Sequence, residues 1–149
     1  MNGSGTRNGE PGAADEPADR PATYRVLGVP LTAVTGTELV SLVAAGVQTR
    51  RREVIVSQNM HGVHTYLHDP DFRSLHDQPG TIVHIDGTPL IWAARIQRLP
   101  VSGEHRTGVI DWIGPVLSAA SDGGWRVYHL GGDKTDLRVG LTTLREQYP

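Results

Sequence analysis

A carboxylate at the end of an apolar, β-branched run is the first candidate for chemistry in this chain. The run Thr81–Ile85 has the character of a strand, and Asp86 and Gly87 follow it directly, before an apolar helical stretch. In open α/β sheets, ligands bind outside the carboxyl ends of the strands, where a charged side chain can meet a substrate. Gly87 permits close approach of the backbone, and the helix beginning beside it offers unpaired N–H groups to an anion. Asp86 is therefore the leading candidate for a catalytic group.

Two further strand ends carry polar or flexible residues. Ser57–Asn59 closes one apolar run, and Gly131–Gly132 follows another, before the last helical stretch. Because parallel strands place their carboxyl ends at one edge of a sheet, we expect both segments to lie beside Asp86. The Gly131–Gly132 pair suits a phosphate-binding turn, and it suits a plain tight turn equally well.

Each candidate residue also has a structural role that would explain it without chemistry. Asp86 and Asn59 can each cap the helix that follows, and Arg106 can be a solvated loop charge. Trp92 has apolar neighbours at helical spacing, so we expect it in the core rather than as a platform for a sugar.

Two motifs that resemble metal sites are expected to have other roles. Asp69–Asp71 looks like the Asp-x-Asp motif of nucleotide-sugar transferases, but it lies between helical segments and is expected to cap a short helix. His61, His64 and His68 share one face of a predicted helix and are able to bind a metal, which leaves a metal-dependent hydrolase open as a further class. They have no acidic or cysteine partner at matching spacing, so the expectation is a solvated or partly buried histidine face.

The elements that must position these residues alternate between strands and helices. Strands are predicted at residues 24–29, 53–57, 81–85 and 125–130, with a turn at Pro30. Helices are predicted after a capping box at Thr35 and Glu38, and at residues 59–68, 69–75, 89–97, 110–121 and 134–147. Such alternation implies βαβ units. We therefore predict an α/β, Rossmann-like fold with a mostly parallel sheet and flanking helices.

Length and composition limit the classes of function. A chain of 149 residues suits a single domain, and a formal charge of −2 with a pI near 6.4 gives no reason to expect nucleic acid as a partner. The chain has no cysteine, which excludes disulfides and thiol catalysis and makes the cytoplasm the default location. The N-terminus lacks the pattern of a secretory signal, and no apolar run is long enough to cross a bilayer.

The N-terminal segment and one basic run differ from the rest of the chain. Residues 1–22 are rich in Gly, Pro, Ala and acids, so we expect a disordered tail before a domain at residues 23–149. The Arg50–Arg52 run either complements a helix C-terminus or contacts an anionic surface.

Several segments, taken together, resemble the WecG/TagA/CpsF glycosyltransferases. The most specific is Asp86–Arg95, which reads Asp-Gly-x-Pro-Leu-Ile-Trp-Ala-x-Arg. The order and spacing of the other segments agree across residues 24–149; these are Val56–Asn59, Asp69–Phe72, Arg106–Gly108 and Val127–Gly132. Gln58 is longer than the small or Pro-like residue usual there, which leaves the choice of donor or acceptor open.

The resemblance implies a reaction and roles for particular residues. The reaction is inverting transfer of a hexose or N-acetylhexosamine, of the N-acetylmannosamine type, from a UDP-sugar to a polyprenyl-diphosphate-linked acceptor, without a metal or other cofactor. The family's catalytic aspartate falls on Asp86, its pocket asparagine on Asn59, its pocket arginine on Arg106 and its hydroxyl residue on Ser57. Peripheral contact with the cytoplasmic membrane face and association into homo-oligomers are implied too. The family continues with a further strand and a basic tail, so we expect its C-terminal part to be missing here.

The chemistry of these residue types is consistent with the implied roles. A carboxylate can take the proton of an acceptor hydroxyl, and a guanidinium can bind a leaving diphosphate bidentately. An asparagine amide can donate to and accept from sugar hydroxyls. The alternative is a nucleotide- or sugar-binding module without transfer activity, through truncation or decay.

Overall fold

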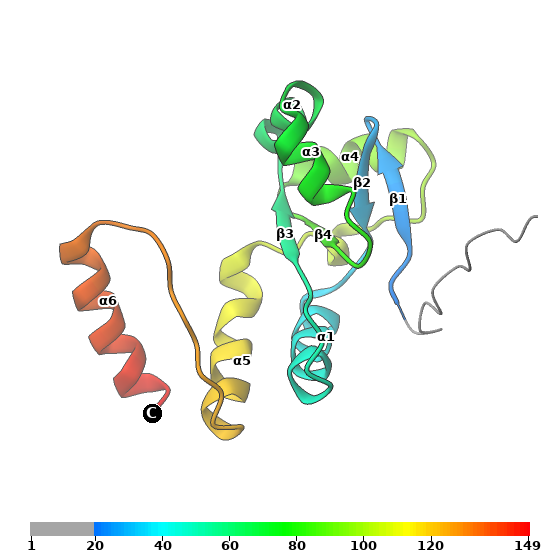
Figure 1. Ribbon diagram of the computed structural model, residues 1–149. Coiled ribbons are helices and arrows are strands. Elements are labelled where there is room, and N and C mark those ends of the chain that lie inside the picture. The colour runs from blue at the N-terminus through cyan, green and yellow to red at the C-terminus, as the bar shows by residue number, and fades with distance from the viewer. Residues whose placement is uncertain (1–19) are drawn as a thin grey trace, which may run out of the picture.

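Four strands and six α-helices are formed within residues 20–149, the part of the chain that this computed structural model describes (Figure 1). The strands are β1 (Thr23–Val26), β2 (Val29–Thr32), β3 (Ile55–Gln58) and β4 (Ile82–Ile85). The helices are α1 (Gly36–Gln48), α2 (Met60–His68), α3 (Pro70–His76), α4 (Thr88–Ile96), α5 (Val109–Asp122) and α6 (Lys134–Gln147), with a short 3₁₀ helix η1 (Gly103–His105). Of the tail expected at residues 1–22, residues 1–19 lie outside the described part.

The parallel pair β3 and β4 is the centre of the fold. Ser57 lies opposite His84 and Gln58 opposite Ile85, and α2 and α3 form the crossover between the two strands. On the other side of β4, Ile85 pairs in parallel with Arg106, and the Val83 N–H donates to the Thr32 hydroxyl of β2 at 3.2 Å. The predicted α/β, Rossmann-like class is confirmed.

The first strand expected from the sequence is a hairpin. β1 and β2 pair antiparallel, and the turn between them is formed by Leu27 and Gly28, whose φ angles are 53° and 83°. Pro30 therefore lies inside β2, opposite Arg25, and the turn expected at Pro30 is wrong. The two left-handed residues match the right-handed twist of the flanking strands, and only Gly28 signals such a turn in the sequence.

The two faces of β4 pack against different helices. Val83 and Ile85 join a buried cluster with residues of α2 and α4, whereas Ile82 joins one with residues of α1 and α5. Successive residues of a strand point to opposite faces, so His84 shares the α5 side with Ile82. Trp92 joins neither cluster, contrary to expectation, and is 61% exposed because α4 buries Leu90, Ile91 and Ala94 instead.

The predicted helix starts are confirmed where the side chains that cap them are local. Thr35 accepts from the Glu38 N–H, and the Glu38 carboxylate accepts from the Thr35 N–H at 2.7 Å. This hydrogen bond from the Thr35 backbone lowers the pKa of the Glu38 carboxyl. Asp69 caps α3 by accepting from the Asp71 and Phe72 amides, as expected for a capping rather than a metal-binding residue.

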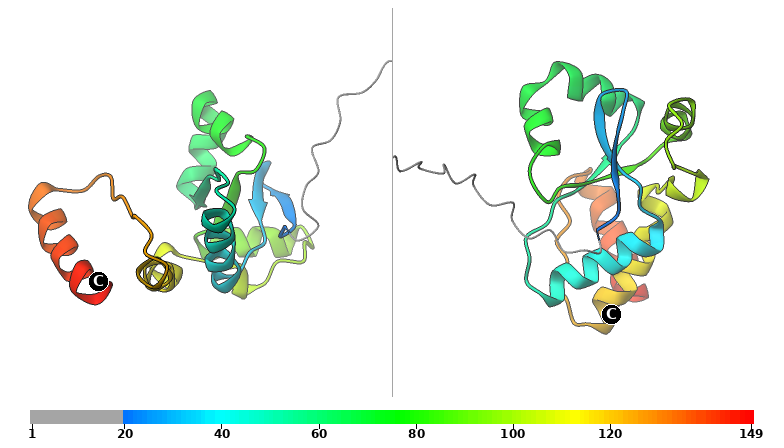
Figure 2. Two further views of the ribbon diagram at one scale, coloured as in Figure 1. Left: turned by 60° about the horizontal axis from the view of Figure 1, so that its bottom comes forward. Right: turned by 90° about the vertical axis from the view of Figure 1, so that its right-hand side faces the viewer.

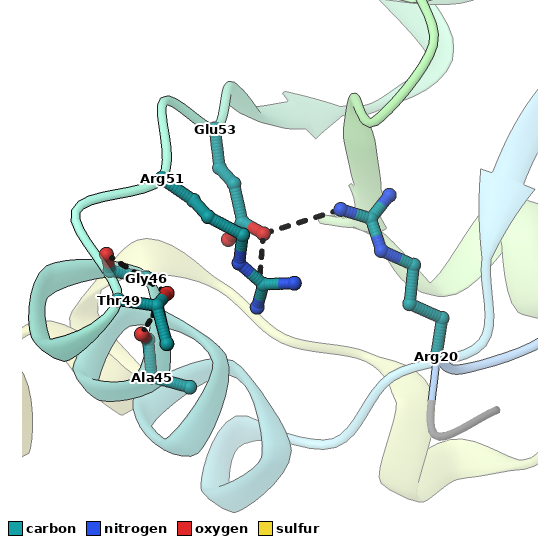
Figure 3. A network of polar contacts seen from close by, with 6 residues as sticks. All are labelled: Arg20, Ala45, Gly46, Thr49, Arg51 and Glu53. Atoms are coloured by element: carbon teal, nitrogen blue, oxygen red, sulfur yellow. Dashed lines mark hydrogen bonds and ion pairs between the residues drawn. The ribbon is translucent and has the colours of Figure 1, made fainter. Parts of the chain in front are cut away.

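An ion-pair network joins the residues before β1 to the loop between α1 and β3 (Figure 3). The Glu53 carboxylate is 3.2 Å from Arg20 and 3.5 Å from Arg51, and its side chain is largely buried. α1 ends at Gln48, and Thr49 donates its hydroxyl to the Ala45 carbonyl, so the Arg50–Arg52 run lies beyond the last turn. Arg51 therefore forms an ion pair within the fold.

The C-terminal part of the chain stands apart from the sheet. Figures 1 and 2 show α5 between the sheet and α6, with an extended segment leading from α5 to α6. The strand expected at residues 125–130 does not form, and Tyr128 and Leu130 are 98% and 99% exposed. The place beside Ile85 is taken by Arg106, so a β-like sequence here finds no partner at that edge. Among the described residues, no helix is long and apolar enough to cross a membrane.

Candidate functional site

The polar residues at the ends of β3 and β4 meet as the sequence predicts. β4 continues its pairing by one residue, because the Asp86 N–H donates to the Gln58 carbonyl at 2.8 Å. The Ser57 hydroxyl donates to Asp86 Oδ2 at 3.3 Å. Asp86 is partly exposed, and the residue at the N-cap of α4 is Gly87, which makes no side-chain capping bond. The Asp86 carboxylate therefore does not cap this helix and is oriented by Ser57.

Asn59 and Gly87 form the adjoining wall of the site. The Asn59 side-chain oxygen accepts from the Gly62 N–H at 3.0 Å and caps α2. Asn59 is exposed, and its two amide hydrogens remain able to bind a ligand. Gly87 has φ 146° and ψ 128°, and a Cβ placed on it would lie 3.8 Å from the Asn59 Cβ. The backbone that carries Asp86 thus passes close to Asn59 in a conformation reserved for glycine.

Arg106 reaches the site through the segment that pairs with the end of β4. The Thr107 N–H donates to the Ile85 carbonyl at 2.7 Å, which places Arg106 and Gly108 beside Asp86. A Cβ on Gly108 would lie 3.4 Å from Asp86 Oδ1 and 3.6 Å from Arg106 Nη1. A carboxylate and a guanidinium therefore border one small space above Gly108, at the start of α5.

Asp111 is a site residue that the sequence reasoning missed. Its Oδ2 accepts from the Gly108 N–H at 3.0 Å and lies 3.3 Å from Arg106 Nη2. Both side chains are about half exposed, so this ion pair is weak and an anionic ligand can exchange with it. The available signal was the three-residue spacing from Gly108, which is the spacing of a capping box.

A buried polar pair lies beneath the site. His84 Nδ1 is 3.0 Å from the Thr107 hydroxyl, and the two residues are 1% and 2% exposed. Burial lowers the pKa of His84, against opposing effects of a hydrogen bond at Thr107 and of the negative charge on Asp86. The imidazole is thus neutral near pH 7.

Gln58 points away from the site, although it lies between two of its residues. Its side chain is fully buried, with Oε1 3.3 Å from His76 Nε2, and a Cβ on Gly62 would collide with it. His76 Nδ1 is 2.8 Å from the Phe72 carbonyl. The long side chain at this position therefore fills the interior beneath α2 and α3.

Gly131 and Gly132 are not brought to this edge, so the expectation that they lie beside Asp86 is wrong. They are exposed, with φ angles of 107° and 87°, and they precede α6, which lies beyond α5 from the sheet (Figure 1). Asp133 then caps α6 by accepting from the Thr135 N–H at 2.8 Å, and this capping lowers the pKa of its carboxyl. The pair is a turn into a capped helix because the strand that would have carried it to the sheet does not form.

The histidines of α2 are exposed and do not converge. His64 and His68 pack edge to face at 4.2 Å between ring centres, and His68 Nδ1 contacts the His64 carbonyl. Within residues 20–149, no three histidine, aspartate or glutamate side chains gather in a way that could hold a metal ion.

Comparison with known protein families decides the class of this chain. The model of the glycosyl transferase WecG/TagA/CpsF family matches residues 24–149. The chain belongs to this family. No curated protein matches it.

Membership of the WecG/TagA/CpsF family makes this chain a glycosyltransferase. Glycosyltransferases bring together a sugar donor and an acceptor, and the matched residues include both strand ends, Arg106 and Gly108. A glycosyltransferase therefore has to accommodate two substrates. The space above Gly108 is the point where the charged side chains of this edge meet.

Proposed function

We propose that this chain is an inverting glycosyltransferase that moves a hexose or N-acetylhexosamine, of the N-acetylmannosamine type, from a UDP-sugar to a polyprenyl-diphosphate-linked acceptor. The product would enter cell-surface polysaccharide or teichoic-acid-like biosynthesis. The observation that carries the proposal is the meeting of Asp86, Ser57, Arg106 and Gly108 at the ends of β3 and β4. The Asp86 carboxylate and the Arg106 guanidinium beside Gly108 suit a reaction that removes a proton and releases a diphosphate.

Asp86 is the base in this proposal. The Ser57 hydroxyl occupies Oδ2, which leaves Oδ1 directed to the space above Gly108. The acceptor hydroxyl gives its proton to Asp86 as its oxygen bonds to the anomeric carbon, and the bond from that carbon to the UDP oxygen breaks on the opposite side. Inversion follows because a single displacement attacks from the face opposite the leaving group.

Arg106 and the helix starts support the departure of UDP. The guanidinium exchanges its exposed contact with Asp111 for the diphosphate, to which it can form two parallel hydrogen bonds. The amides that begin α4 and α5 lie beside Gly87 and Gly108 and add positive potential. The amide hydrogens of Asn59 bind a sugar hydroxyl or acetamido oxygen, which is compatible with the cap that its side-chain oxygen forms on α2.

The proposed acceptor determines where in the cell this protein would act. A polyprenyl diphosphate is anchored in the membrane, so the proposal includes peripheral contact of this protein with the cytoplasmic face. Assembly into homo-oligomers is part of the same proposal.

The test is release of UDP by the full chain, given UDP-N-acetylmannosamine and a polyprenyl-diphosphate-linked acceptor. Asp86→Asn should lower kcat by about 10² to 10⁴, the contribution of a general base, while UDP binding by calorimetry is retained. Asp122→Asn, the same change at the exposed end of α5, is the matched control. Full activity of Asp86→Asn would refute the assignment of the base. Wild-type UDP binding without UDP release would favour the alternative of a binding module.

A further inference from the structure

Thr107 attaches the segment that carries Arg106 to β4. The Thr107 backbone N–H donates to the Ile85 carbonyl at 2.7 Å, and its hydroxyl lies 3.5 Å from the same carbonyl. The hydroxyl also lies 3.0 Å from His84 Nδ1. Thr107 thus binds two successive residues of β4, one through its backbone and one through its side chain.

The His84 ring is itself fixed by packing against α5. Its ring meets the Trp112 ring of α5 edge to face, with centres 5.6 Å apart and planes at 86°. The residue is 1% exposed, and Trp112 is 9% exposed. The imidazole is therefore wedged between β4 and α5, and few rotamers are open to it.

Both neighbours of Thr107 in the chain are residues of the candidate site. Arg106 carries the guanidinium, and Gly108 keeps open the space that Asp86 also borders. Loop residues beside a strand end normally have several conformations available. A buried polar bond at Thr107 removes much of that freedom, and breaking it would leave a buried polar atom unpaired.

We infer that His84 is a positioning residue which, through the Thr107 hydroxyl, fixes the Arg106–Gly108 segment against the end of β4 and so holds the Arg106 guanidinium beside Asp86. His84 does not touch substrate, because it is buried beneath Thr107. The consequence for catalysis rests on the proposed function, in which Arg106 binds the diphosphate of UDP.

The first measurement is independent of any substrate. Thr107→Val removes only the hydroxyl and keeps the shape, and His84→Leu removes the imidazole nitrogens. Both variants should speed hydrogen exchange at the residue 107 amide, whereas exchange at the Asp86 amide, bonded to Gln58, should not change. Thr107→Ser, which keeps the hydroxyl, and His84→Asn, which keeps an amide where Nδ1 lies, should restore slow exchange. Thr142→Val, at an exposed hydroxyl bonded to Arg138 in α6, is the matched control.

The second measurement tests whether the Thr107 hydroxyl affects UDP binding through Arg106. Thr107→Val should weaken UDP binding, measured by calorimetry, by about tenfold, the factor that one ordinary hydrogen bond supplies. If the effect passes through Arg106, adding Thr107→Val to Arg106→Ala should weaken binding no further. Thr107→Ser should bind UDP as the wild type does.

The outcomes separate this inference from the proposed function. Unchanged exchange at residue 107 in both variants, or losses of UDP binding that add to that of Arg106→Ala, would overturn the positioning role. A wild-type chain that binds no UDP would instead contradict the proposed function, and the exchange measurement would still decide whether His84 fixes the segment.

Discussion

Replacing Gly108 by alanine tests whether the space at the start of α5 is where substrate binds. Gly108 has φ −61° and ψ 146°, a conformation that alanine adopts freely, so the backbone is not strained. The new methyl group would lie 3.1 Å from Asp111 Oδ2, 3.4 Å from Asp86 Oδ1 and 3.6 Å from Arg106 Nη1. Only the contact with Asp111 is tighter than ordinary, and that side chain is half exposed and free to move.

The two effects of this substitution should therefore differ greatly in size. Displacing Asp111 loses its bond to the Gly108 amide and its exposed ion pair, which together stabilise the fold by about 1 kcal/mol. The expected fall in the melting temperature is about 3 °C for a chain of this size. The methyl group occupies the space between the Asp86 carboxylate and the Arg106 guanidinium. In the proposed reaction this is where the substrates meet, and displacement of reacting groups by about 1 Å can cost about 100-fold in turnover.

The assay compares Gly108→Ala with Gly103→Ala. Gly103 lies in η1, and a Cβ placed there meets no atom within 4 Å. Thermal unfolding, UDP calorimetry and UDP release are measured on both. Gly103→Ala should resemble the wild type, whereas Gly108→Ala should fold but lose turnover. Turnover of Gly108→Ala equal to that of Gly103→Ala would refute the placement of the substrates.

Three further predictions concern stability. Thr35→Ala removes the hydroxyl of the α1 capping box and should cost about 1 kcal/mol in denaturant unfolding; an unchanged midpoint would contradict the role of the cap. Gly87→Ala should cost about 2 kcal/mol because its φ of 146° strains any L-residue, more than Gly28→Ala at φ 83°, although neither methyl group meets a close atom; equal costs would refute the strain argument. The folded pKa of His84 lies below the unfolded value near 6.5, so its stabilising effect is complete above about pH 6.5 and is lost as pH falls toward the folded pKa, with a slope of at most about 1.4 kcal/mol per pH unit. His84→Asn should remove that part of the slope in urea unfolding at several pH values, and an unaltered slope would show that other groups cause it.

The elements that could be predicted from the sequence are those whose signals are local. The caps of α1 and α3 bind amides within three residues, so Thr35 and Asp69 mark their helices without any tertiary information. The meeting of Ser57 and Asp86 was also predictable, because parallel neighbours must end at one edge.

The failures are those in which a segment depends on a distant partner. The sequence 125–130 has the composition of a strand, but a strand needs an edge to pair with, and Arg106 and Thr107 pair with Ile85 instead. The residues around Arg106 and Thr107 have no β-like pattern, so the sequence does not predict that they pair with Ile85. The ion pair between Asp111 and Arg106 could not be predicted for the same reason, since it depends on where Arg106 comes to lie.

Because Gln58 is buried, the identity of this residue does not act directly on substrate choice. Its side chain faces His76, so lengthening or shortening it alters the support under α2 and α3 rather than the surface that a sugar would meet. The His76 ring is fixed from its other side, because Nδ1 donates to the Phe72 carbonyl at 2.8 Å, while Nε2 faces Gln58 Oε1 at 3.3 Å. A shorter residue at position 58 would remove the side chain that faces His76 Nε2, so we expect a compensating change at position 76. Residues 58 and 76 would then vary as a pair during evolution or redesign, and they would affect Ser57 and Asn59 by changing the packing beneath them.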